Sequence, residues 1–133
     1  MRLRIVAGVI LLVALAGAGA VAAPGTSFVG PDKQWTIVNF QDPVLVKDRF
    51  VMGQVLIVHD TGKMARGEAC TTFYGFDPAR GPGEEIVSFH CQPRESKIVE
   101  TTTLTTKHIE PGCKRLVEYQ IAGDFEVHGM PQR

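Results

Sequence analysis

The segment Phe50-Val-Met-Gly-Gln-Val-Leu-Ile-Val-His59 decides the fold class of this chain. Successive residues of an extended strand point to opposite faces. One face carries Val51, Val55 and Ile57, and the other carries Met52, Leu56 and Val58. A strand with two apolar faces is typical of the covered centre of a sheet. We expect the strand to end in a turn at Asp60-Thr-Gly-Lys63, where Gly62 takes a positive φ.

Runs rich in Val, Ile, Thr and aromatic residues recur on both sides of this segment, separated by Gly, Pro and Asp, without a sustained helical period. The predicted strands are Gln34–Phe40, Val44–Val46, Phe50–His59, Cys70–Phe76, Glu85–Cys91, Ile98–Thr106, Leu116–Ile121 and Phe125–Val127. This spacing predicts an all-β fold over residues 32–133, as a single-domain antiparallel β-sandwich or small barrel of about seven to eight strands. The spacing alone does not distinguish the sandwich from the barrel.

The N-terminus has the three parts of a secretory signal peptide. In order they are the basic residues Arg2 and Arg4, the apolar run from Ile5 to Leu15, and the small residues Ala20-Val-Ala22. Cleavage after Ala22 predicts a signal peptide over residues 1–22, a flexible leader over residues 23–31, and a periplasmic or extracellular protein without a membrane span. The alternative is an uncleaved anchor, which the weakly hydrophobic Ala and Gly of the run disfavour.

Signal cleavage changes the charge balance of the chain. It removes Arg2 and Arg4 but no acidic residue, so twelve Lys and Arg remain against fourteen Asp and Glu. The mature chain is mildly acidic and has no basic patch with interleaved aromatic residues. Nucleic acid is therefore not an expected partner.

Export makes disulfide bonds chemically allowed, and the three cysteines leave one unpaired. Asp77-Pro-Ala-Arg-Gly-Pro-Gly83 has the composition of a loop between two strands. A hairpin centred between Arg80 and Gly81 sets Cys70 opposite Cys91, within disulfide range. We predict a Cys70–Cys91 disulfide that stabilises the fold by about 2–4 kcal/mol.

Cys113 is left over in this scheme. It lies in Pro111-Gly-Cys-Lys-Arg115, a predicted turn, as a free or intermolecular thiol. The rival pairing joins Cys91 to Cys113.

Side chains that soft and borderline metals favour are frequent in the chain. They are His59, Asp60, Met64, Cys70, His90, Cys91, His128 and Met130. His90 and Cys91 are neighbours on a predicted strand and point to opposite faces, and a disulfide would remove both of its cysteines as thiolate ligands. The candidates that remain are His59, Met64 and His128, with copper as the ion.

The sequence favours a different interpretation of these residues, without a cofactor. In it, His59 is a strand-end residue hydrogen-bonded by Asp60 or by backbone, Met64 fills an edge of the core, and His128 lies in a mobile tail.

No Ser or Cys lies in a recognisable nucleophile motif, so the sequence favours a non-enzymatic protein. We expect an exported domain that binds a partner protein, a small ligand or an envelope surface. Binding through the loops of a sandwich would use Asp60–Ala69 and Asp77–Gly83. The candidate contacts there are Asp60, Lys63, Arg66 and Arg80. The alternative function is a metal-binding or redox protein that uses His59, Met64 and the cysteines.

The segment from His59 to Cys70, HDTGKMARGEAC, is followed by Phe89-His-Cys91 and by Ala122-Gly-Asp-Phe-Glu-Val-His-Gly-Met-Pro131. In these segments the chain resembles a group of small exported bacterial proteins. The resemblance implies bacterial export and one compact domain. It implies no activity, substrate or cofactor.

Overall fold

The computed structural model describes residues 26–131, so the predicted signal peptide and the start of the predicted leader lie outside the described residues. Nine strands and one short helix form this part of the chain. They are β1 (Ser27–Val29), β2 (Lys33–Val46), β3 (Arg49–Asp60), α2 (Thr61–Ala65), β4 (Thr71–Asp77), β5 (Gly81–Phe89), β6 (Gln92–Glu95), β7 (Thr103–Glu110), β8 (Cys113–Gln120) and β9 (Glu126–Gly129). The all-β prediction is confirmed. Within residues 26–131, no helix has the length and apolar character needed to cross a membrane.

All nine strands belong to one mixed sheet. Its main path runs β5-β4-β3-β2-β8-β9-β6, with β1 paired to β2 and β7 paired to β8. The β2–β8 pairing is parallel, through Val44 with Lys114 and Leu45 with Arg115. The prediction of a purely antiparallel arrangement is therefore wrong at this point. Strands far apart in sequence can pair in parallel because the long connection between them has room to cross over.

A bend in β2 makes this pairing geometrically accessible. Before the bend, Phe40 pairs with Gly53 of β3, and after it Val44 pairs with Val51, so the register shifts between the two pairs. Pro43 lies in the shifted segment, where its missing N–H costs no ladder bond, and Gly53 takes a positive φ of 83°. The sequence predicted two separate strands here, because Gln41-Asp-Pro43 has the composition of a turn. The structure instead forms one bulged strand.

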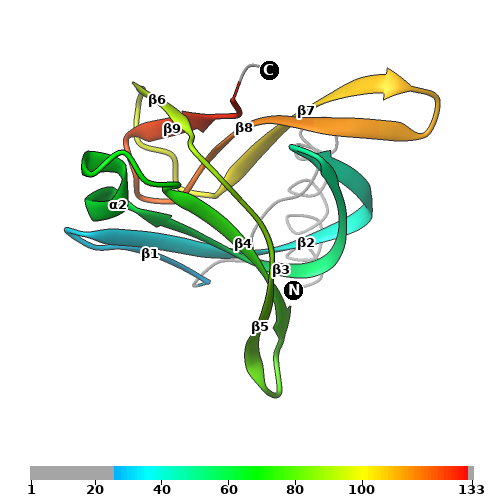
Figure 1. Ribbon diagram of the computed structural model, residues 1–133, viewed down its shortest axis with the longest axis horizontal. Helices are drawn as coiled ribbons and strands as arrows, with labels where there is room; N and C mark the ends of the chain where they lie inside the picture. Colours follow the sequence, from blue (N-terminus) through cyan, green and yellow to red (C-terminus); the bar gives the residue numbers. More distant parts are fainter. Residues whose placement is uncertain (1–25, 132–133) are drawn as a thin grey trace, which may run out of the picture.

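The sheet folds over into two layers. Figure 1 shows β1 to β4 on one side and β7 to β9 on the other. Side chains join the layers: the hydroxyls of Thr71 on β4 and Tyr119 on β8 are 2.6 Å apart, and the Phe73 and Tyr119 rings meet edge to face. The largest fully buried side chains include Tyr119, Phe40, Phe73, Phe89, Ile57, Leu104, Leu116 and Ile121. The core therefore lies between the layers.

The β4–β5 hairpin has a different register from the predicted one. Thr71 pairs with Phe89 and Asp77 pairs with Gly81, so the predicted alignment of Cys70 opposite Cys91 is wrong by one residue near the cysteines. Two register shifts inside the hairpin move its turn, which composition alone could not reveal. The cysteines nevertheless meet just beyond the paired residues, where the chain leaves β5 after Phe89.

Three further differences concern the ends of elements. Ser27–Val29 of the predicted leader form β1, which pairs with β2. The predicted turn after His59 is instead the helix α2, capped by Asp60, and Gly62 is not among the glycines with positive φ. The predicted strand Ile98–Thr106 is displaced along the chain. The observed strand, β7, begins at Thr103 and extends to Glu110, where it pairs with β8 across the turn at Pro111 and Gly112.

The hydrogen bond between the layers gives a first prediction. Both Thr71 and Tyr119 are fully buried, so Tyr119→Phe leaves the Thr71 hydroxyl without its partner. We expect the free energy of unfolding to fall by about 1–3 kcal/mol, measured by urea denaturation. Tyr74→Phe, at a half-buried site on β4, is the control and should change stability by less than about 0.5 kcal/mol. Equal effects of the two substitutions would contradict the role of this bond.

Candidate metal centre

His59 reaches the core because of its place on β3. It shares a face with Val55 and Ile57, and all three side chains are fully buried. Gln34 lies directly opposite on β2, and its Oε1 is 2.7 Å from His59 Nδ1. The amide of Gln34 is oriented by its Nε2, which donates to the carbonyl of Gly30. His59 Nδ1 is therefore the donor, and neutral His59 keeps its lone pair on Nε2.

His59 Nε2 points at no hydrogen-bond partner. Among the side chains of the described residues, it is the buried nitrogen that has none. A buried acceptor without a partner is costly, and each such atom in a folded protein calls for an explanation, such as a ligand that the atom receives.

His128 enters the same space from β9. It is fully buried, and its Nε2 is 3.4 Å from Oδ2 of Asp124. The second oxygen of Asp124 accepts the backbone N–H of Glu126, which holds the carboxylate in place. Because a carboxylate only accepts, His128 Nε2 donates and the lone pair of the ring lies on Nδ1. That atom faces Cys91, whose Sγ is 3.6 Å away.

Cys91 and Cys70 complete the buried group. Their sulfurs are 2.9 Å apart without a covalent bond between them, and the Cys91 N–H donates to the Cys70 sulfur. Cys70 is 2 % exposed and Cys91 is 8 % exposed. The predicted disulfide is thus not formed in this structure, although the two residues lie side by side.

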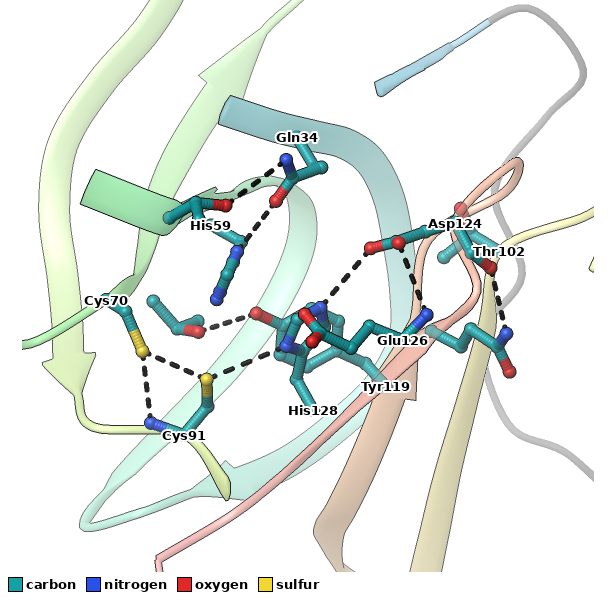
Figure 2. A network of polar contacts seen from close by, with 12 residues as sticks. Gln34, His59, Cys70, Cys91, Thr102, Tyr119, Asp124, Glu126 and His128 are labelled. Carbon is teal, nitrogen blue, oxygen red and sulfur yellow. Dashed lines mark hydrogen bonds and ion pairs between the residues drawn. The ribbon is translucent and has the colours of Figure 1, made fainter. Parts of the chain in front are cut away.

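The ligand atoms of His59, Cys91 and His128 converge. All three lie within 4.8 Å of one another, and the two imidazole rings are tilted by 33° with centroids 4.1 Å apart. The rings come from β3 and β9, and Figure 2 shows both beside the cysteine pair. We call His59, Cys91 and His128 the buried triad. Two imidazole nitrogens and one thiolate are the ligands that copper and zinc favour.

The residues around the buried triad match a metal-binding geometry. Metal-bound histidines usually donate their second ring N–H to an oxygen, which fixes the tautomer and the ring orientation. Gln34 does this for His59, and Asp124 does it for His128. His128 therefore presents the lone pair of Nδ1 to the Cys91 sulfur, and His59 keeps a lone pair on Nε2 that no other group in the described residues uses.

Burial and neighbouring groups shift the pKa values of several side chains at this site. Burial, followed by repulsion from His59, lowers the pKa of His128 to about 4, so this ring is neutral at pH 7. A hydrogen bond from Cys91 lowers the pKa of the Cys70 thiol. Hydrogen bonding to Cys70, together with burial, raises the pKa of Cys91. Of the two thiols, Cys70 therefore loses its proton more readily than Cys91.

The structure places only some of the residues that the sequence proposed as metal ligands in one site. It brings His59 and His128 together, so the interpretation of His128 as part of a mobile tail is wrong. Met64 lies outside the triad and packs against the core, as expected in the interpretation without a cofactor. Asp60 caps α2 and does not bond His59. His90 is exposed, in line with the expected divergence from Cys91.

The candidate loop contacts do not form one site. Asp60 accepts the backbone N–H of Lys63, and the exposed Arg66 pairs with Glu68. Asp60, Lys63 and Arg66 therefore make local contacts within and beside α2. Arg80 lies at the tip of the β4–β5 hairpin. Figure 1 shows this hairpin projecting away from α2.

Sequence reasoning missed Cys91 as a ligand, because it assigned that sulfur to a disulfide. It also gave no role to Gln34 or Asp124. One signal was available for His59, whose spacing from Val55 and Ile57 places it on the buried face of the strand. No sequence pattern placed His128 near the buried face of β3, since β9 comes close to β3 only because the sheet folds over.

The lowered pKa of His128 predicts a pH dependence of stability for the metal-free protein. Unfolded histidine has a pKa near 6.5, so between this value and about 4 the unfolded chain binds a proton that the folded chain does not. The free energy of unfolding should fall by about 3 kcal/mol as pH drops through this window. His128→Gln should flatten the slope, and His90→Gln at an exposed site should not. Identical slopes in all three proteins would rule out this assignment.

Comparison with known proteins found no matching family model, no matching curated protein and no matching solved structure. The function is therefore argued from the geometry and chemistry of the buried triad.

Proposed function

We propose that the protein is an exported, non-enzymatic binding domain whose ligand is one soft or borderline metal ion, copper or zinc. The observation that carries the proposal is the buried, unpartnered Nε2 of His59, a residue whose ligand atom lies within 4.8 Å of those of His128 and Cys91. A cation between these atoms would accept the His59 lone pair. It would thereby remove the cost of burying that nitrogen without a partner.

The ligand set has the composition that copper and zinc prefer. Two neutral imidazoles and one thiolate carry a single negative charge, which suits Cu⁺ or Zn²⁺ better than the oxygen-preferring Mg²⁺ and Ca²⁺. Cys70 lies 2.9 Å from the Cys91 sulfur and is the nearest candidate for a fourth ligand. Copper was the ion that the sequence suggested, and the buried triad supports it through two of the three candidates, His59 and His128.

Burial favours binding over catalysis at this site. His59 and His128 are fully buried, and Cys91 is nearly so. Asp124, His128 and Cys91 do line up as a carboxylate, a base and a thiol. A nucleophile of this type must be reached by a substrate, whereas the Cys91 sulfur belongs to a residue that is only 8 % exposed and contacts a fully buried histidine.

One feature of the sequence supports the compartment in which this function would operate. The N-terminal pattern of residues 1–22 supports export, and with it a compartment in which a Cys70–Cys91 disulfide is chemically allowed. A disulfide and a metal thiolate compete for the same Cys91 sulfur. Our proposal places the metal on the reduced protein.

Metal titration tests the proposal directly. Reduced, metal-free protein is titrated with Zn²⁺ by calorimetry, and with Cu⁺ under anaerobic conditions against a competing chelator. We expect one ion per chain, and a gain in thermal stability on binding because the site exists only in the folded chain. His59→Ala and Cys91→Ser should each weaken binding by about 100-fold or more, since each removes a direct ligand.

Matched controls are available in the same chain. His90→Ala and His108→Ala remove exposed histidines, and Cys113→Ser removes the half-buried third cysteine. Binding should be unchanged in these three variants. Uptake that survives both His59→Ala and Cys91→Ser would refute the site.

A further inference from the structure

The two sulfurs of Cys70 and Cys91 are held in contact by backbone interactions on both sides. The Cys70 carbonyl accepts the N–H of Asp60 at the end of β3, and the Cys70 sulfur accepts the N–H of Cys91. The sulfurs are 2.9 Å apart, so a covalent bond between them requires only a small approach. This contact lies at the open end of the β4–β5 hairpin, beyond the last paired residues Thr71 and Phe89.

Cys113 does not compete for this pairing. Cys91 contacts His128, which pairs with Tyr119 of β8, and Cys113 lies six residues before Tyr119 on the same strand. Six strand residues span about 20 Å, far beyond the reach of a disulfide. The rival Cys91–Cys113 pairing is therefore incompatible with the fold.

We infer that Cys70 and Cys91 act as a redox gate on the buried triad, in which oxidation by a small-molecule disulfide such as oxidised glutathione joins the two sulfurs and releases the metal ion. This inference rests on the proposed metal-binding function. In the reduced state Cys91 is a ligand. In the oxidised state its sulfur is bonded to Cys70 and has no negative charge to offer a cation, so His59 and His128 are the two ligands left.

The reaction balances as two successive thiol–disulfide exchanges. The Cys70 thiolate attacks one sulfur of the disulfide RSSR, which forms a Cys70–SR mixed disulfide and expels RS⁻. The Cys91 thiolate then leaves the metal ion, attacks the Cys70 sulfur and expels the second RS⁻. Two electrons pass from the cysteines to RSSR, the Cys70 proton goes to water, and the ion dissociates.

The surroundings of Cys91 favour a Cys70–Cys91 disulfide that is easily reduced over a permanent structural disulfide. In the reduced, metal-free state, the single proton of the Cys91 thiol can go either to the Cys70 sulfur or to His128 Nδ1. Oxidation removes this proton and leaves His128 Nδ1 as a buried acceptor without a donor, in addition to His59 Nε2, which lacks a donor in both states. The additional unpaired acceptor disfavours the disulfide state and makes it easier to reduce.

Access for the oxidant is through the hairpin end. Glu68 and His90, on either side of the cysteine pair along the chain, are exposed, while Cys70 and Cys91 are buried. Local opening of the residues beyond the paired part of β4 and β5 would expose Cys70 without disturbing the rest of the sheet.

The test compares Zn²⁺ binding by the same protein in two redox states. Cys113→Ser protein is used to prevent intermolecular disulfides, and Zn²⁺ serves as the probe because it does not oxidise thiols. The reduced protein is titrated, treated with oxidised glutathione, freed of reagent, and titrated again. Peptide mapping checks the Cys70–Cys91 bond. We expect Zn²⁺ affinity to fall by about 100-fold or more on oxidation and to recover after reduction with dithiothreitol.

A second variant separates the gate from the ligands. Cys70→Ser, in the Cys113→Ser background, retains His59, Cys91 and His128 but cannot form the internal disulfide. Its Zn²⁺ affinity should be the same before treatment with oxidised glutathione and after treatment followed by removal of any mixed disulfide. Unchanged affinity in protein with a mapped Cys70–Cys91 bond would overturn the gate and leave metal binding intact. Absence of Zn²⁺ binding by the reduced protein would instead overturn the proposed function.

Discussion

The bend in β2 between Phe40 and Val44 is the constraint on which the rest of the structure depends. Before the bend, the strand belongs to the ladder with β3, and beyond it the strand also pairs in parallel with β8. This change turns one continuous sheet over onto itself, as Figure 1 shows. The buried triad lies between the two layers, since β3 supplies His59 and β9 supplies His128. Without the fold in the sheet, these side chains would not meet.

The polar groups around the triad give it a defined chemical state. Gln34 and Asp124 each accept from one ring nitrogen, so His128 Nδ1 carries a lone pair 3.6 Å from the Cys91 sulfur and His59 Nε2 carries a lone pair without a partner. Three different occupants can satisfy that sulfur: a proton shared with His128, a metal ion, or the sulfur of Cys70. The proposed function and the proposed gate therefore both depend on one buried sulfur atom.

The sequence determined the fold class and much of the strand placement. The apolar run along Phe50–His59 located the central strand, although the expectation of two covered faces is wrong: Val51, Val55 and Ile57 are buried, whereas Met52 on the other face is exposed. The Pro and Gly punctuation located most of the other strands. Register was less accessible, since the irregularities inside the β4–β5 hairpin depend on packing against β3 and leave no simple mark in the composition.

The candidate site shows the same division. The sequence by itself identified His59, His128, Cys70 and Cys91 as chemically capable residues, and it placed the two cysteines close together because a hairpin is a local structure. Tertiary structure alone decided that His128 is buried against His59, and that Gln34 and Asp124 fix their tautomers. The physical reason is distance along the chain. Contacts between residues about 70 positions apart arise from how the sheet folds over, and no local pattern of residue types encodes that arrangement.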